Sequence, residues 1–204
     1  MLQNRVDPWG HIIKTSARGT WMGNRGLLHD ENKNIRRSFR LKTWITCVLQ
    51  FKGWKRKVMT PDRYTELFFL DEATSFAAGH RPCFECRRED ALRFKSFWLK
   101  GNPEYGFDGR VPIGEIDNIL HGERIDKQGE KVSYTAAIGD LPDGCFIEWE
   151  GIAHLVSGGN IFSWTPFGYE KGNVLPVEQK VNVLTPASVV NAFRAGYVMQ
   201  VVLP

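Results

Sequence analysis

The sequence predicts an α+β protein, in which a zinc-knuckle-like unit packs with a carboxy-terminal antiparallel sheet or small barrel. From residue 131 onward, short alternating apolar segments are separated by Glu-Gly and Ser-Gly-Gly-Asn turn signals, which is typical of antiparallel strands. Apolar residues three or four apart predict helices at 87–99 and 185–196. A Cys-x-x-Cys pair, Cys83 and Cys86, directly precedes the first of these helices.

The chain divides into three predicted regions. Residues 1–40 are rich in Gly, Asn and Arg and predict a basic arm or loop. Residues 41–100 predict a hairpin, followed by the Cys-x-x-Cys knuckle and a helix. Residues 101–204 predict a mostly antiparallel β unit with a terminal helix, and the turn-rich segment 101–114 marks its start.

The elements of the middle region follow from alternation and capping signals. Residues 43–51, TWITCVLQF, alternate between two faces and predict a strand that turns through KGWK into a second strand at 56–60. A further strand is predicted within 64–70, YTELFFL. A short helix should follow, with Asp71 as its cap and Gly79 as the left-handed residue that ends it.

The carboxy-terminal region is predicted to begin with a short helix at 115–125. Alternating segments then predict strands at 145–149, 152–156, 161–164 and 181–184. Thr185 should cap the last helix, with Pro186 at its first position and Gly196 closing it. The final segment, 198–204, predicts an edge strand.

The charge is unevenly distributed along the chain. The net charge is +4, but residues 1–60 carry 13 Lys and Arg against 3 acidic residues, whereas residues 61–204 carry 14 against 20. A basic half indicates nucleic acid or another polyanion as partner, and the alternative is a solvated basic face that aids solubility. Gly-rich ARGTWMGNRG, with Trp21 as a stacking side chain, belongs to this half. The predicted phosphate-binding residues are Arg18, Arg25, Lys55, Arg56, Arg87 and Arg88.

A cytoplasmic protein without a membrane span is expected. The amino terminus has no apolar segment typical of a secretory signal, and no apolar run approaches the roughly 18 residues that a membrane helix needs. Four cysteines in such a chain indicate thiols or a metal rather than a disulfide framework.

The Cys-x-x-Cys stretch favours zinc as the cofactor, because such a turn directs two thiolates at one tetrahedral ion. Zinc needs further ligands, and the candidates are Cys47, His80 and His121. Each could instead be an ordinary core or surface residue.

Residues 68–90, FFLDEATSFAAGHRPCFECRRED, resemble the end of the zinc-binding domain of Ada-type DNA alkylation-repair proteins. The matching residues are Gly79, Arg81, Pro82, Cys83 and Cys86. In that family the knuckle supplies two of the four zinc thiolates, and the domain contacts DNA phosphates. The resemblance therefore implies a metal site and a DNA partner. Cys47 is the one cysteine that lies upstream of the knuckle here.

A zinc-dependent hydrolase or deaminase-like enzyme, acting on a nucleobase or nucleotide, is the main alternative. His121-x-Glu123 together with PCFEC resembles the ligand and general acid/base set of zinc nucleobase deaminases, although the order of the two motifs is reversed. His121 would then be the third ligand and Glu123 the catalytic residue.

Two further alternatives are a redox pair at the start of a helix and a metal-free protein-interaction domain. The first interpretation is a zinc-stabilised nucleic-acid-binding protein linked to DNA repair or modification. Whether the chain is an enzyme stays open.

Overall fold

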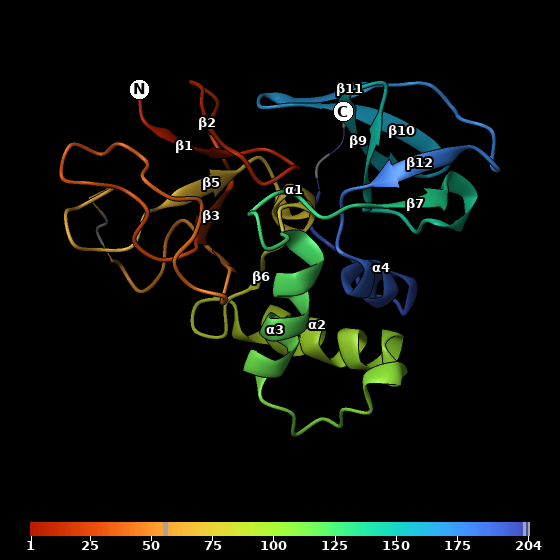
Figure 1. The fold of residues 1–204 in the computed structure, drawn as a ribbon, viewed down its shortest axis with the longest axis horizontal. Coiled ribbons are helices and arrows are strands. Elements are labelled where there is room, and N and C mark those ends of the chain that lie inside the picture. The colour runs from red at the N-terminus through yellow and green to blue at the C-terminus, as the bar shows by residue number, and fades with distance from the viewer. Residues whose placement is uncertain (55–56, 202, 204) are drawn as a thin grey trace.

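The described residues form two six-stranded sheets, with one short helix between them and three longer helices packed below (Figure 1). The computed structural model describes residues 1–54, 57–201 and 203. The mixture of helices and strands confirms the α+β prediction. None of the helices formed by these described residues is long and apolar enough to cross a membrane.

The amino-terminal sheet has the strand order β2-β1-β5-β3-β4-β6. Its strands are β1 (Gln3–Val6), β2 (Ile12–Lys14), β3 (Trp21–Asn24), β4 (Ile45–Cys47), β5 (Leu67–Phe69) and β6 (Arg81–Pro82). The pairs β1–β5 and β4–β6 are parallel, and the other pairs are antiparallel.

Residues 1–40 are therefore not an arm, because they supply three strands of this sheet. Glycine is a loop signal in the sequence, but Gly23 lies within β3 for a packing reason. A Cβ at this position would lie 2.4 Å from Cε2 of Phe69. Only glycine lets the Phe69 ring pack this closely against the strand.

The predicted hairpin is also absent from the described part of the middle region. β4 ends at Cys47, and residues 48–54 and 57–66 form no strand. Lys52, Met59 and Asp62 have positive φ angles of 49°, 52° and 60°, which interrupt an extended chain. β4 pairs instead with β3 and β6.

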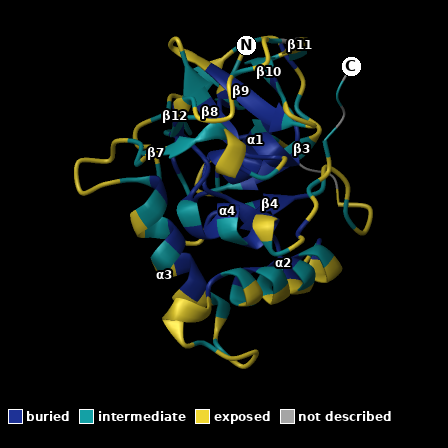
Figure 2. Cartoon of the chain, turned by 90° about the vertical axis from the view of Figure 1, so that its right-hand side faces the viewer, coloured by how far each residue is buried: buried dark blue, intermediate teal, exposed yellow. Residues whose placement is uncertain are grey.

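The central helix α1 (Glu72–Ala77) begins and ends as predicted. The backbone N–H of Thr74 donates to the Asp71 carboxylate at 2.8 Å, and Gly79 has a φ of 81°. All six helix residues are buried, because α1 contacts β3 and β5 of one sheet and β8 (Phe146–Trp149) of the other. Figure 2 shows this buried centre in dark blue.

The carboxy-terminal sheet is antiparallel and has the order β11-β10-β9-β8-β12-β7. Its other strands are β7 (Tyr134–Ala137), β9 (Ile152–Ser157), β10 (Asn160–Thr165), β11 (Gly168–Lys171) and β12 (Lys180–Val183). The predicted strands of this region are thus present, whereas residues 198–201 form no strand.

Three helices cover the core beside this sheet: α2 (Arg88–Gly101), α3 (Ile113–Arg124) and α4 (Ala187–Arg194). Short 3-10 turns lie at Pro103–Tyr105 and Ile138–Asp140. In α2 the predicted stripe of Ala91, Phe94 and Trp98 is buried, and exposed residues lie along its outer side (Figure 2). Gly101 is where α2 meets α4, because a Cβ there would lie 2.3 Å from the carbonyl oxygen of Asn191.

The cap of α4 differs from the prediction. The hydroxyl oxygen of Thr185 accepts the backbone N–H of Phe146 at 2.8 Å, so Thr185 fastens the helix to β8. The Glu123 carboxylate caps α4 instead. It accepts the backbone N–H of Ser188 at 3.2 Å and the Ser188 hydroxyl at 2.6 Å.

Within the described part of the chain, two buried arginines have no carboxylate in hydrogen-bond contact, and they lie between the amino-terminal sheet and α3. Arg25 and Arg124 are each 1% exposed, and both guanidinium groups stack on Trp44 with their carbons 4.0 Å from the ring centre. Arg25 Nε donates to His80 Nε2 at 3.1 Å, and Arg124 donates to the carbonyl oxygens of Gly79 and Lys42. Burial lowers the pKa of both arginines to about 9. Trp44 and backbone carbonyls therefore replace the counter-ions that buried cations usually have.

Candidate metal centre

The parallel pairing of β4 with β6 brings Cys47 beside Cys83. Ile45 is opposite Arg81 and Thr46 is opposite Pro82, so the next positions along the two chains are Cys47 and Cys83. The backbone N–H of Cys83 donates to the carbonyl oxygen of Thr46 at 3.0 Å and continues this ladder. A residue distant in the sequence is thus placed at the knuckle by strand register.

The turn that follows brings in Cys86. The backbone N–H of Glu85 donates to Cys83 Sγ at 3.4 Å, and the N–H of Arg87 donates to the Cys83 carbonyl oxygen at 3.0 Å. These bonds fold the four residues of the Cys-x-x-Cys motif into one turn before α2. The Sγ atoms of Cys47, Cys83 and Cys86 all lie within 4.8 Å of one another.

This spacing fits a tetrahedral thiolate site. With zinc–sulfur bonds of about 2.3 Å, tetrahedral geometry places sulfur atoms about 3.8 Å apart. The three cysteines could therefore hold a metal ion with little movement. Among the residues that the structure describes, no fourth cysteine, histidine or carboxylate joins this group.

The sulfur atoms share hydrogen bonds that favour a single thiolate. The hydrogen bond from Cys47, with a second one from Cys86, holds the pKa of Cys83 well below its usual range. The same bond raises the pKa of Cys47, which must keep its proton to donate it. Cys47 and Cys83 are buried, with Met22 and Phe68 packed around them. Three thiolates in such apolar surroundings need a cation, and a divalent metal would supply it.

Two buried ion pairs fix the segment that carries the knuckle. Arg81 donates to both carboxylate oxygens of Asp117, from Nε at 2.8 Å and from Nη2 at 2.7 Å. Arg87 pairs with Glu72 of α1 and with Asp90, and its guanidinium stacks on Trp21 at 4.0 Å. The turn is therefore attached to α3 on one side and to α1 on the other.

The histidines predicted as ligands lie elsewhere. His80 is fully buried beneath Arg25, with its ring 5.1 Å from that of Trp44. His121 Nδ1 lies 3.0 Å from Arg124 Nη2, and its ring packs edge-on against Phe39. The structure brings neither histidine into the cysteine group, and Glu123 caps α4. The His121-x-Glu123 motif is thus separate from the Cys-x-x-Cys motif.

The predicted phosphate-binding residues separate into buried and exposed ones. Arg25 and Arg87 are buried and hold the fold together through the contacts described above. Arg18 and Arg88 are exposed. Lys55 and Arg56 lie outside the described residues.

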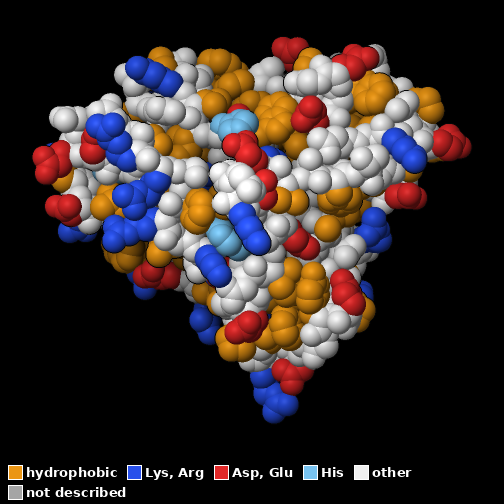
Figure 3. Space-filling model, in the orientation of Figure 1, with side chains coloured by type: hydrophobic (Ala, Val, Ile, Leu, Met, Phe, Trp, Pro, Cys, Tyr) orange, Lys and Arg blue, Asp and Glu red, His pale blue; other side chains and the backbone are white. Residues whose placement is uncertain are grey.

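A second group of exposed cations was not among the predicted site residues. The segment 36–42, between β3 and β4, is mostly exposed, and its basic side chains are Arg36, Arg37, Arg40 and Lys42. Figure 3 shows Lys and Arg side chains gathered over the side of the molecule that the amino-terminal sheet forms in Figure 1. The density of Lys and Arg in this segment was a signal that the sequence already contained.

Comparisons with protein-family models, with curated proteins and with solved structures gave no match to this chain.

Proposed function

We propose that the protein binds zinc through Cys47, Cys83 and Cys86. The observation that carries the proposal is the approach of three sulfur atoms to within 4.8 Å, from two segments far apart in the sequence. Thiolate ligands favour zinc over magnesium or calcium, which prefer oxygen. The bound ion would join the end of β4 to the turn that begins α2. With three protein ligands, the fourth tetrahedral position would be taken by water or an external ligand.

Metal analysis of the purified chain tests this proposal. We expect one zinc per chain, and a cobalt-substituted protein with intense sulfur-to-cobalt charge-transfer absorption. Cys47→Ser should weaken zinc binding by about 100-fold or more, because a zinc ligand is lost. The matched control is Cys145→Ala, since Cys145 is fully buried in the core away from the group. Substoichiometric zinc after reconstitution, or equal affinity in Cys47→Ser and the control, contradicts the proposal.

Nucleic-acid binding by the zinc-stabilised protein is the second part of the proposal. Exposed cations flank the cysteine group along the chain, because Lys52 and Lys57 follow Cys47 and Arg88 follows Cys86. The basic segment 36–42 lies in the same amino-terminal part of the protein. Exposed cations of this kind suit contacts with a phosphate backbone, and zinc would stabilise the fold that presents them.

The salt dependence of binding tests the second part. We expect the affinity for a DNA or RNA oligonucleotide to fall steeply between low and moderate salt. Replacing Arg37 and Arg40 by glutamate should reduce the slope of log affinity against log salt by about 1 to 2. Lys127→Glu, an exposed change in the carboxy-terminal half, is the control. Affinity that is independent of salt, or equal losses in both variants, removes the nucleic-acid proposal and leaves the zinc proposal intact.

A further inference from the structure

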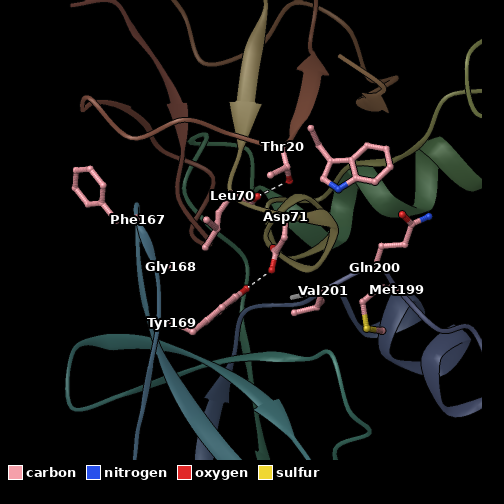
Figure 4. Close-up of a pocket in the computed structure, with 10 residues that line it drawn as sticks. Thr20, Leu70, Asp71, Phe167, Gly168, Tyr169, Met199, Gln200 and Val201 are labelled. Atoms are coloured by element: carbon pink, nitrogen blue, oxygen red, sulfur yellow. Dashed lines mark hydrogen bonds between the residues drawn. The ribbon is translucent and has the colours of Figure 1, made fainter. Parts of the chain in front are cut away.

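A pocket of about 630 Å³ opens between the two sheets, on side chains unrelated to the cysteine group (Figure 4). It is lined from β3 by Trp21, from the start of α1 by Asp71, from the β10–β11 turn and β11 by Phe167 and Tyr169, and from the carboxy-terminal segment by Gln200. Its size lies in the range of small-molecule sites, about 300 to 1,000 Å³.

Asp71 and Tyr169 form the polar part of this pocket. The Tyr169 hydroxyl donates to Asp71 Oδ2 at 2.6 Å, and Figure 4 shows the two side chains meeting across the space between β11 and α1. The other carboxylate oxygen, Oδ1, accepts the Thr74 hydroxyl at 2.7 Å and the Thr74 backbone N–H at 2.8 Å. Trp164 Nε1 in turn donates to the Thr74 hydroxyl at 3.1 Å. The carboxylate is therefore held in one orientation.

Around Asp71, the hydroxyl groups of Tyr169 and Thr20 offer acceptor lone pairs to a ligand, because their hydrogens are already used. A carboxylate oxygen accepts about two hydrogen bonds, so Asp71 Oδ1 is saturated while Oδ2 can accept one more. The hydroxyl hydrogen of Tyr169 is used on Asp71, and that of Thr20 is used on the carbonyl oxygen of Leu70 at 2.6 Å. The remaining lone pairs of these groups require a ligand that donates. Trp21 and Gln200 are the lining residues with side-chain N–H groups.

The Asp71 carboxylate also has no cation partner among the described residues. It is 6% exposed and takes part in none of the ion pairs found in the described part of the chain, whereas the neighbouring Glu72 is paired with Arg87. A neutral ligand would cover the negative charge of Asp71 and increase the cost of removing it from water. A cationic ligand would neutralise this charge.

The remaining walls of the pocket are apolar or aromatic. Phe167 stands at the mouth of the pocket and is 71% exposed, which is unusual for a phenylalanine side chain. Trp21 and Met199 also line the pocket. Arg87 stacks on the Trp21 ring, and Glu72 and Asp90 pair with its charge. Aromatic faces attract organic cations and also pack against apolar groups.

We propose that this pocket binds a small organic amine in its protonated form. The ammonium group donates to Asp71 Oδ2 and to the Tyr169 oxygen, and the apolar body of the ligand packs against the apolar and aromatic lining. The inference is independent of the zinc and nucleic-acid proposals, because it uses none of their residues.

Three probes that share a phenethyl group test this inference on the full chain: phenethylamine, 2-phenylethanol and the bulkier phenethyltrimethylammonium. Binding is followed by amide and indole NMR shifts. We expect phenethylamine to bind saturably and to shift Trp21 and Tyr169. The neutral alcohol should bind at least about tenfold more weakly than phenethylamine. The quaternary ammonium, which lacks an N–H donor, should also bind at least about tenfold more weakly. Equal binding of the alcohol, or shifts confined to another surface, overturns the inference.

Asp71→Asn removes the charge and retains an N-capping side chain for α1, so it should fold. It should weaken phenethylamine binding by about tenfold or more and leave 2-phenylethanol unchanged. Tyr169→Phe, which removes one acceptor, provides a second variant if Asp71→Asn proves unstable, and it should also weaken amine binding. Phe97→Leu, at a residue that packs with Tyr197 outside the pocket, is the control. Unchanged amine affinity in a folded Asp71→Asn or Tyr169→Phe protein contradicts the proposed site.

Discussion

Replacing Asp117 by asparagine would remove one charge of the ion pair that anchors β6, and with it the knuckle, to α3. Arg81 and Asp117 are buried, with side chains that are 4% and 3% exposed, and two hydrogen bonds join them. Arg81 has a further bond from Nη1 to the Pro82 carbonyl oxygen at 3.0 Å. After the substitution the guanidinium of Arg81 stays buried and loses its carboxylate partner.

The expected cost follows from this burial. Removing one partner of a buried ion pair costs about 3–5 kcal/mol of unfolding free energy. Asparagine keeps one oxygen that can accept from Arg81, so we expect the lower end, about 3 kcal/mol. For a chain of this length, about 3 kcal/mol corresponds to a fall in Tm of roughly 6–12 °C.

Urea unfolding of the zinc-loaded protein measures the effect, and Asp108→Asn is the matched control. The Arg110–Asp108 pair has similar hydrogen bonds, but its side chains are 93% and 60% exposed. The control should leave the unfolding free energy nearly unchanged, because exposed ion pairs contribute little to stability. Equal effects of the two substitutions, or a loss below about 1 kcal/mol for Asp117→Asn, would refute the reasoning that burial gives this pair its importance.

Three more changes have expected outcomes. Gly101→Ala should lower the unfolding free energy measured in urea by about 1–3 kcal/mol, because its Cβ would meet the Asn191 carbonyl oxygen. Gly122→Ala, on an open face of α3, should raise this free energy by up to about 1 kcal/mol. A stabilising Gly101→Ala together with a destabilising Gly122→Ala would exclude close packing of α2 on α4. Glu123→Ala should lose about 1 kcal/mol by uncapping α4 and keep its zinc content, and a loss of zinc would show that Glu123 acts at the metal. Burial, with the nearby charge of Arg25, lowers the pKa of Lys131 to about 7, so the folded protein releases a proton that the unfolded chain retains up to about pH 10. The unfolding free energy of the wild type, measured in urea, should therefore rise between pH 7 and 10 relative to that of Lys131→Met. Lys127→Met is the control. The same pH dependence in the wild type and in Lys131→Met would contradict the lowered pKa.

Local signals in the sequence predicted the elements whose determinants are local. Asp71 and Gly79 bound α1, and the stripe of Ala91, Phe94 and Trp98 faces the core, because caps and helical periodicity act within a few residues. The alternating strands of the carboxy-terminal sheet were found for the same reason.

The predictions that the structure corrects concern residues whose partners come from distant segments. Gly23 was interpreted as a loop residue, because the ring of Phe69 that requires glycine comes from another strand. Arg25 and Arg87 were predicted on the surface, but Trp44 and Glu72 hold them in the interior. No local pattern in the sequence gives such partners.

The metal site depends on a local turn motif and also on the pairing of distant strands. Cys83 and Cys86 are paired by a turn motif that the sequence shows directly. Cys47 was a candidate beside His80 and His121, and only the parallel register of β4 and β6 distinguishes it from them. Parallel strands pair across long connections, so their register cannot be inferred from a hairpin rule.

The stacking of Arg25 and Arg124 on Trp44 limits how this chain could be shortened or recombined. The three residues come from the segment after β3, the segment before β4 and the end of α3, so each predicted region contributes one. A fragment that began at residue 41 would keep the cysteines but lose one of the two cations that cover the indole. A fragment that ended at residue 100 would lose the other. The Cys-x-x-Cys stretch is therefore not a portable module, and grafting it into another protein would leave behind the interior that shapes it.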